Sequence, residues 1–92
     1  MSIAKFEVDK FTGDNDFSLW RIKMKALLVH QGLSEAIEPD AFQDSIDDKK
    51  KIQEIETKAH SAILLSLGDE VLREVSDELT AYGLWSKLDV IY

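Results

Sequence analysis

Apolar residues between positions 17 and 32 recur every three or four places, in the stretch FSLWRIKMKALLVHQG. This spacing lines one face of an α-helix. The members of the stripe are Phe17, Trp20, Met24, Leu27 and Leu28. Asp16 or Ser18 can cap the start of the helix, and Gly32 is the residue type that ends one in a left-handed turn. The pattern therefore predicts a helix between Phe17 and Gly32.

The opposite side of the same helix is also apolar. Its members are Leu19, Ile22, Ala26 and Val29. Basic residues fill the gaps between the two stripes in two pairs, Arg21 with Lys25 and Lys23 with His30. A helix with two apolar faces is either sandwiched inside its own domain or shared with another molecule. Most apolar stripes are core, so the pattern alone favours a central core helix, and a second stripe shared with another molecule is the alternative.

The N-terminal stretch IAKFEVDKF, residues 3–11, alternates loosely between apolar and polar positions. Such alternation is typical of a short extended segment on a surface. A single strand has no strand partner within this sequence, so we expect an arm that lies along the helices or pairs with another chain. Phe11 is the expected anchor of this arm, and residues 12–15 are predicted to turn into the first helix.

The stretch after the first helix is predicted to form one helical turn and then a loop. Ser34 can cap a turn that holds Leu33 and Ile37, and Pro39 ends it. Residues 40–48 are polar and acidic, and we expect a loop there.

A longer helix is predicted from Asp47 to Leu67, where the helical period returns. Its apolar stripe is Ile52, Ile55, Ala59, Ala62 and Ile63, and its opposite face is polar. Leu64, Leu65 and Leu67 add apolar positions around the circumference near the C-terminal end. We therefore expect that end to be buried deepest.

Two shorter helices complete the chain. Gly68 breaks the long helix, and Asp69 can cap the next one, which runs through EVLREV. Its inward positions are Val71, Leu72, Val75 and Leu79. Thr80 can cap the last helix. The stripe of that helix is Ala81, Leu84, Trp85, Leu88 and Ile91. This stripe is still running at Tyr92, so we expect a fragment of a longer protein.

Together these elements predict an all-α fold, a small bundle of about four to five helices with a short extended N-terminal arm. At 92 residues the chain is long enough for one domain, which we place at 1–92. The expected core combines the inward stripes of three helices: Phe17, Trp20, Met24, Leu27, Leu28, Ile55, Ala59, Ile63, Trp85 and Leu88.

Composition narrows the range of partners. The chain has no cysteine, which removes disulfides and thiolate metal sites. Its formal net charge is −7, and its one basic run, Lys49 to Lys51, follows several aspartates. Nucleic-acid-binding surfaces normally carry a basic excess, so we expect no direct contact with nucleic acid. No stretch resembles a signal peptide or a membrane span, so we expect an intracellular, soluble protein without membrane contact.

Candidate chemistry is sparse. Without cysteine or an HExxH spacing, His30 and His60 make a weak metal site. Asp14 and Asp16 are spaced like the start of a calcium loop, but Leu19 stands where that loop requires glycine. The sequence has no glycine-rich phosphate loop and no nucleophile motif. We therefore expect no catalytic residue, metal, cofactor or small-molecule substrate, and no enzyme activity.

Three blocks of residues stand in a characteristic order. The first comprises Phe11-x-Gly13, Phe17-x-x-Trp20, Met24-x-x-Leu27-Leu28, Gly32-Leu33 and Ile37. The second is Glu56-x-x-Ala59-x-x-x-Ile63-x-x-x-Leu67, and the third is Thr80-Ala81-x-x-Leu84-Trp85-x-x-Leu88, closing on Tyr92. From Lys10 to Tyr92 this order resembles the opening of copia-type retrotransposon Gag polyproteins. Two positions depart from the family: Gly83 replaces a helix former that is often acidic, and Ile52 replaces a frequent tryptophan.

The resemblance implies a structural capsid protein and places this chain in the N-terminal lobe of the capsid region. Proteins of this family self-assemble in the cytoplasm into virus-like particles that enclose the element's RNA. Their zinc knuckle, which binds nucleic acid, lies far downstream and outside this chain. The first helices would line rings of five or six copies, with Leu19, Ile22, Ala26 and Val29 as the candidate assembly interface. The alternative is a domesticated Gag-derived helical adaptor that binds peptides or protein partners.

Overall fold

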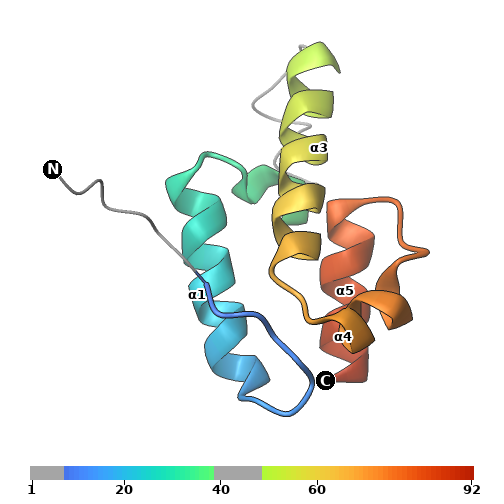
Figure 1. The fold of residues 1–92 in the computed structure, drawn as a ribbon. Coiled ribbons are helices and arrows are strands. Elements are labelled where there is room, and N and C mark those ends of the chain that lie inside the picture. The colour runs from blue at the N-terminus through green and yellow to red at the C-terminus, as the bar shows by residue number, and fades with distance from the viewer. Residues whose placement is uncertain (1–7, 39–48) are drawn as a thin grey trace, which may run out of the picture.

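The computed structural model describes residues 8–38 and 49–92. The described residues form four α-helices and one short 3-10 helix (Figure 1). In chain order they are α1 (Phe17–His30), η1 (Ser34–Ile37), α3 (Lys49–Leu65), α4 (Asp69–Val75) and α5 (Ala81–Ile91). The predicted all-α class is therefore confirmed. The predictions for an arm at 3–7 and for a loop at 40–48, with Pro39, lie outside the described residues.

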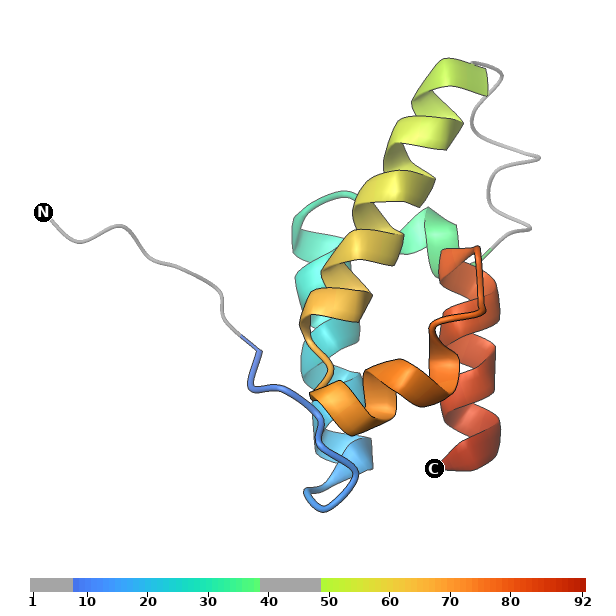
Figure 2. The ribbon, with the colours of Figure 1, turned by 45° about the vertical axis from the view of Figure 1, so that its right-hand side comes forward.

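The helices are arranged around α3. Figure 1 shows α1 on one side of α3 and α5 on the other, and in Figure 2 α3 crosses in front of α1; in both views α4 is turned across the end of the bundle where α3 ends. η1 packs against both α3 and α5, and α5 packs against α3 and α4. The first half of α3 projects beyond its neighbours in both views.

Three of the five residues predicted to cap or end a helix do so in the structure. The Asp16 carboxylate accepts a hydrogen bond from the Leu19 N–H at 3.1 Å, so Asp16 rather than Ser18 caps α1. Gly32 adopts φ +73°, the left-handed conformation expected after a helix. The Thr80 hydroxyl accepts from the Gly83 N–H at 2.9 Å and caps α5.

The other two predicted caps are wrong. Leu33 occupies the capping position of η1, without a side-chain hydrogen bond, and Ser34 is the first residue of the turn. Gly68 occupies the capping position of α4, and Asp69 lies inside its first turn. A carboxylate in the first turn still interacts favourably with the helix dipole, so Asp69 retains a stabilising role there.

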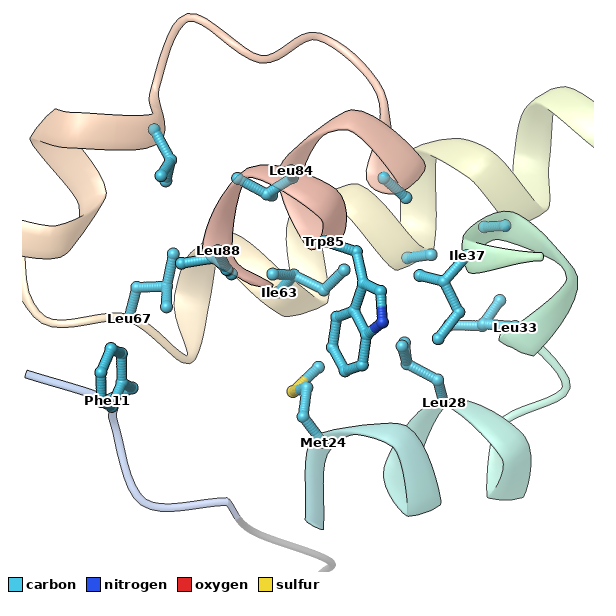
Figure 3. Close-up of a cluster of buried hydrophobic side chains, with 14 of the residues drawn as sticks. Phe11, Met24, Leu28, Leu33, Ile37, Ile63, Leu67, Leu84, Trp85 and Leu88 are labelled. Carbon is cyan, nitrogen blue, oxygen red and sulfur yellow. The ribbon is translucent and has the colours of Figure 1, made fainter. Parts of the chain in front are cut away.

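The core forms where α1, α3 and α5 face one another. Figure 3 shows Trp85 at its centre, with Met24 and Leu28 approaching from α1, Ile63 from α3 and Ile37 from η1. Eight predicted core residues are buried: Trp20, Met24, Leu28, Ile55, Ala59, Ile63, Trp85 and Leu88. The remaining two, Phe17 and Leu27, are half-buried and pack against the same cluster.

Three apolar residues expected to face inward are instead exposed. Leu65, the last residue of α3, is 77% exposed, and Leu79 in the α4–α5 connection is 85% exposed. Leu65 follows buried Ile63 by two positions, a rotation of roughly 200° that carries it to the opposite side of the helix. Ile91, at the end of α5, is 42% exposed.

The extended N-terminal segment has a backbone partner within the chain, contrary to our expectation. The Phe11 N–H donates to the Ser66 carbonyl at 3.0 Å, and the Gly68 N–H donates to the Phe11 carbonyl at 2.8 Å. This pair of bonds makes a parallel bridge between Phe11 and Leu67, in the connection between α3 and α4. Phe11 itself is fully buried, as expected of an anchor.

Candidate assembly surface

We call the first stripe of α1, Phe17, Trp20, Met24, Leu27 and Leu28, its inner face. Polar contacts at the edges of this face fix it to the rest of the bundle. The Trp20 indole N–H donates to the Ser66 carbonyl at 3.1 Å. The Arg21 guanidinium makes two hydrogen bonds to the Asp89 carboxylate, at 2.7 and 2.9 Å, and lies 5.0 Å from the centroid of the Trp85 ring. These contacts join α1 to the α3–α4 connection and to α5, so they set the rotation of α1 about its own axis.

The Arg21–Asp89 pair is well oriented although it lies at the surface. The hydrogen bond to Asp89 raises the pKa of Arg21 above its already high ordinary value, against a smaller opposing effect of desolvation. Exposed ion pairs contribute at most about 1 kcal/mol, and a two-bond arginine–carboxylate geometry is the favourable case. The pair therefore serves mainly to orient α1.

With the inner face fixed, the second stripe of α1 faces water. Leu19 is 48% exposed, Ile22 is 67% exposed and Val29 is 57% exposed. Ala26 lies among them and is also exposed. We call this set of four residues the outer face of α1. Several large apolar side chains together on one exposed helix face are typical of an interaction surface. All four predicted interface residues therefore lie on one accessible surface.

Basic side chains border the outer face. α1 contains Arg21, Lys23 and Lys25 and no aspartate or glutamate. Lys25 lies 3.7 Å from the Glu38 carboxylate, a distance typical of a weak, exposed ion pair. The outer face is thus an apolar strip with a basic margin on a chain that is acidic as a whole.

Comparisons with known proteins show the family of this chain. The sequence model of one family, described as the gag-polypeptide of LTR copia-type, matches residues 24–92. The chain belongs to the copia-type gag polypeptide family. The chain is also 39% identical, over all 92 residues, to the Retrovirus-related Pol polyprotein from transposon TNT 1-94 of Nicotiana tabacum, and spans 7% of that protein's length. No solved structure matches the chain significantly.

The three blocks on which the resemblance rested occupy distinct parts of this Gag chain. The first covers the entry segment, α1 and η1, the second lies on α3 and extends to Leu67, and the third lies on α5. Ile52 and Gly83 are the two positions at which the chain departs from the resemblance. Ile52 is half-buried on α3. At Gly83 a Cβ would lie 2.9 Å from the Thr80 hydroxyl and 2.7 Å from the Glu78 carboxylate. Glycine at this position therefore leaves room for the Thr80 cap and for Glu78.

Two contacts of the Gag chain escaped the sequence analysis. The Glu56 carboxylate on α3 accepts a short hydrogen bond from the Ala81 N–H at the start of α5. A ring nitrogen of His60 lies 2.8 Å from the Glu78 carbonyl. Both contacts fasten the α4–α5 connection to α3. The available signal was Glu56 at the head of the second block, whose side chain the apolar stripes do not explain.

An aromatic cluster closes the end of the bundle where α1 begins. Phe11 contacts Phe17, Trp20 and Tyr92, with ring centroids 5.2, 5.8 and 4.7 Å apart. The Tyr92 hydroxyl donates to the Glu74 carboxylate at 3.0 Å. Burial, together with the bond to Glu74 and the charges of Glu74 and Glu70, raises the pKa of Tyr92 above its ordinary value. The cluster ties the entry segment, α1, α4 and the end of α5 together.

The described part of the chain offers little else that could act chemically. In residues 8–38 and 49–92, no group of three or more histidine or acidic side chains is placed to hold a metal ion. None of the described helices is long and apolar enough to cross a membrane. A groove of about 680 Å³ does lie between the α1–η1 turn and α3, with Leu33, Ile55 and Leu65 in its lining.

Proposed function

We propose that this Gag chain is a structural, non-catalytic capsid subunit, the N-terminal lobe of the capsid region, which self-associates into virus-like particles around the element's RNA in the cytoplasm. Membership of the Gag family supports this role. The observation that carries the proposal is the outer face of α1, where Leu19, Ile22 and Val29 stand in water although the helix is firmly anchored. An apolar surface held outward in this way is suited to pack against another subunit.

Assembly would proceed through weak contacts repeated many times. A single contact through one helix face buries less than the roughly 1,200 Å² of a standard stable interface. In a closed ring of five or six copies, each subunit is held at two sites, so effective concentration strengthens contacts that are individually weak. The net charge of −7 argues that other parts of the polyprotein contact the RNA.

The test compares three chains by sedimentation velocity across about a hundredfold concentration range, with electron microscopy of the most concentrated samples. Ala26→Asp places a charge in the middle of the outer face, and Thr57→Asp makes a charge change of the same sign at an exposed position on α3. We expect the mass of the wild-type and Thr57→Asp chains to rise with concentration, and Ala26→Asp to remain a folded monomer. Identical curves for all three chains would contradict the proposal.

The second candidate function is a peptide-binding adaptor, favoured by the groove between the α1–η1 turn and α3. Leu65 lines this groove and is 77% exposed, so the groove offers apolar surface to a bound peptide. An adaptor would bind peptides through the groove and would not depend on the outer face of α1. If Leu65→Asp abolished the binding of apolar peptides while Ala26→Asp left all properties unchanged, the adaptor would be the better account.

A further inference from the structure

We infer that the outer face of α1 docks onto a different surface of the next copy, an acidic corner formed by Asp77, Glu78 and Leu79, so that subunits join head to tail. The inference rests on the proposed function, because it names the partner surface of the same interface. Charge, exposure and position in the fold each support it.

The charge of α1 disfavours pairing of two outer faces. Arg21, Lys23 and Lys25 make the helix wholly basic in its charged residues. Arg21 and Lys25 already pair with Asp89 and Glu38, so Lys23 is the main charge at the margin. In a symmetric dimer the same patch faces itself, so Lys23 beside one outer face would meet the same margin of the other. Charges of the same sign at a contact oppose association. The favourable partner is therefore an apolar surface with acidic margins.

The connection between α4 and α5 provides such a surface. This connection, residues 76–80 with the sequence SDELT, includes two acidic residues and no basic one. Within this stretch Leu79 is 85% exposed and directly follows Asp77 and Glu78. Lys87 lies 3.1 Å from Asp77 and 3.8 Å from Glu78, so one cation is shared between two carboxylates. The corner therefore stays negative and presents an apolar side chain at its tip.

The acidic corner is held in place by the rest of the bundle. His60 contacts the Glu78 carbonyl, and Glu56 accepts from the Ala81 N–H, so α3 fixes the connection on both sides of Leu79. A surface that is already ordered loses little conformational freedom when it binds. An 85% exposed leucine on such a rigid support is therefore well suited to act as a docking residue.

The two surfaces lie on opposite sides of the molecule. In Figures 1 and 3, α1 bounds the core on one side, and the α4–α5 connection lies beyond α5 on the other. Met24 and Leu28 point from α1 into the core in Figure 3, so the outer face points away from α5. A contact between two different surfaces of identical subunits generates closed rings or open filaments rather than a dimer. This geometry agrees with rings of subunits.

The shapes of the two surfaces are also compatible. Ala26 is the smallest member of the outer face, with Ile22 four residues before it and Val29 three residues after it. On a helix these spacings place a small residue between two larger ones, which forms a shallow hole. Leu79 of the next copy would fill this hole, with Asp77 and Glu78 on the side of Lys23.

Thiol cross-linking tests the inference directly, because the natural chain has no cysteine. Three single variants are prepared: Ala26→Cys on the outer face, Leu79→Cys on the acidic corner and Thr57→Cys as an exposed control on α3. Pairs are mixed at high concentration with a short bismaleimide. One member of each pair is isotopically labelled, so that intact mass distinguishes mixed from identical dimers.

We expect the Ala26→Cys and Leu79→Cys mixture to give mixed dimers well above the yield of Thr57→Cys with Leu79→Cys. Each variant alone should give only the control yield. Adding Lys23→Glu to the Ala26→Cys chain should lower the mixed yield, since it reverses one of the charges that attract the corner.

Two results would overturn the inference in different ways. Efficient dimers of Ala26→Cys with itself would show that the outer face joins copies but pairs symmetrically, which preserves self-association through this face and removes both the head-to-tail contact and the rings built from it. Control yields from Ala26→Cys in every mixture would overturn the docking of the outer face on the acidic corner, and the proposed function would fail with it only if Ala26→Asp also sedimented like the wild-type chain.

Discussion

The two faces of α1 are similarly apolar in sequence but have opposite fates in the structure. Met24 and Leu28 on the inner face are fully buried, whereas Ile22 and Val29 on the outer face are more than half exposed. The inner stripe carries the larger side chains, two of them aromatic, and burying their apolar area outweighs an exposed ion pair of at most about 1 kcal/mol. Polar contacts, chiefly from Trp20 to Ser66 and from Arg21 to Asp89, fix the orientation of the buried stripe. The comparison shows that side-chain size separates two apolar stripes, while polar anchors orient the one that is buried.

The largest expected difference between core and outer face is in stability. Trp85→Ala removes the side chain at the centre of the core and should lower the free energy of unfolding by about 3–5 kcal/mol. The matched change on the outer face, Ile22→Ala, should alter it by no more than about 0.5 kcal/mol. Urea unfolding followed by circular dichroism measures both. A comparable loss in the two variants would mean that the outer face is also part of the core.

A smaller effect is expected at the anchor beside the inner face. Trp20→Phe keeps an aromatic ring but removes the N–H that bonds to the Ser66 carbonyl. That carbonyl still accepts from the Phe11 N–H, so it is not left unsatisfied, and we expect a loss of about 1–2 kcal/mol. The same unfolding measurement applies. An unchanged stability would show that the indole N–H does not help to hold α1.

The ion pair between α1 and α5 should contribute less. Arg21→Gln should lower stability by up to about 1 kcal/mol, and the difference from wild type should shrink as salt is added. Lys23→Gln, which removes an equal charge from the same helix, serves as the control and should leave stability nearly unchanged. If both variants lost the same amount, the effect would come from the net charge of α1 and not from the pair with Asp89.

The smallest effect concerns the aromatic cluster at the end of the inner face. Because the folded chain raises the pKa of Tyr92, the neutral phenol is favoured in the folded state. The stabilisation that the neutral Tyr92 phenol gives the folded state is complete below the pKa of an unfolded tyrosine, about 10. It is lost as pH rises through the higher pKa of Tyr92 in the folded state. Wild type should therefore lose stability above about pH 10 more steeply than Tyr92→Phe. Parallel pH profiles for the two chains would contradict this role of Tyr92.

Much of the fold could be predicted because its signals are local. The stripes of α1, α3 and α5 and the caps at Asp16 and Thr80 depend on residues three or four places apart, which the sequence displays directly. The resemblance to Gag rested on the order of such local blocks, and the family comparison confirmed it.

The contacts that could not be predicted join residues far apart in the chain. Trp20 and Ser66 are 46 positions apart, and Glu56 and Ala81 are 25 apart. The bridge from Phe11 to Leu67 is of the same kind. The spacing of residues along the chain therefore cannot predict these contacts. Leu65 and Leu79 were predicted to face inward because they are apolar, but both are exposed. Burial depends on which neighbours the tertiary fold places beside a side chain.

The most direct test of the account follows the methyl groups of the chain by NMR as its concentration is raised. The account predicts that methyl signals of Leu19, Ile22 and Val29 on the outer face shift with concentration, together with those of Leu79 on the acidic corner. Signals of the buried Ile55 and Ile63 should stay in place. Shifts confined to other surfaces, or an outer face whose signals do not change, would contradict the claim that this face joins one subunit to the next.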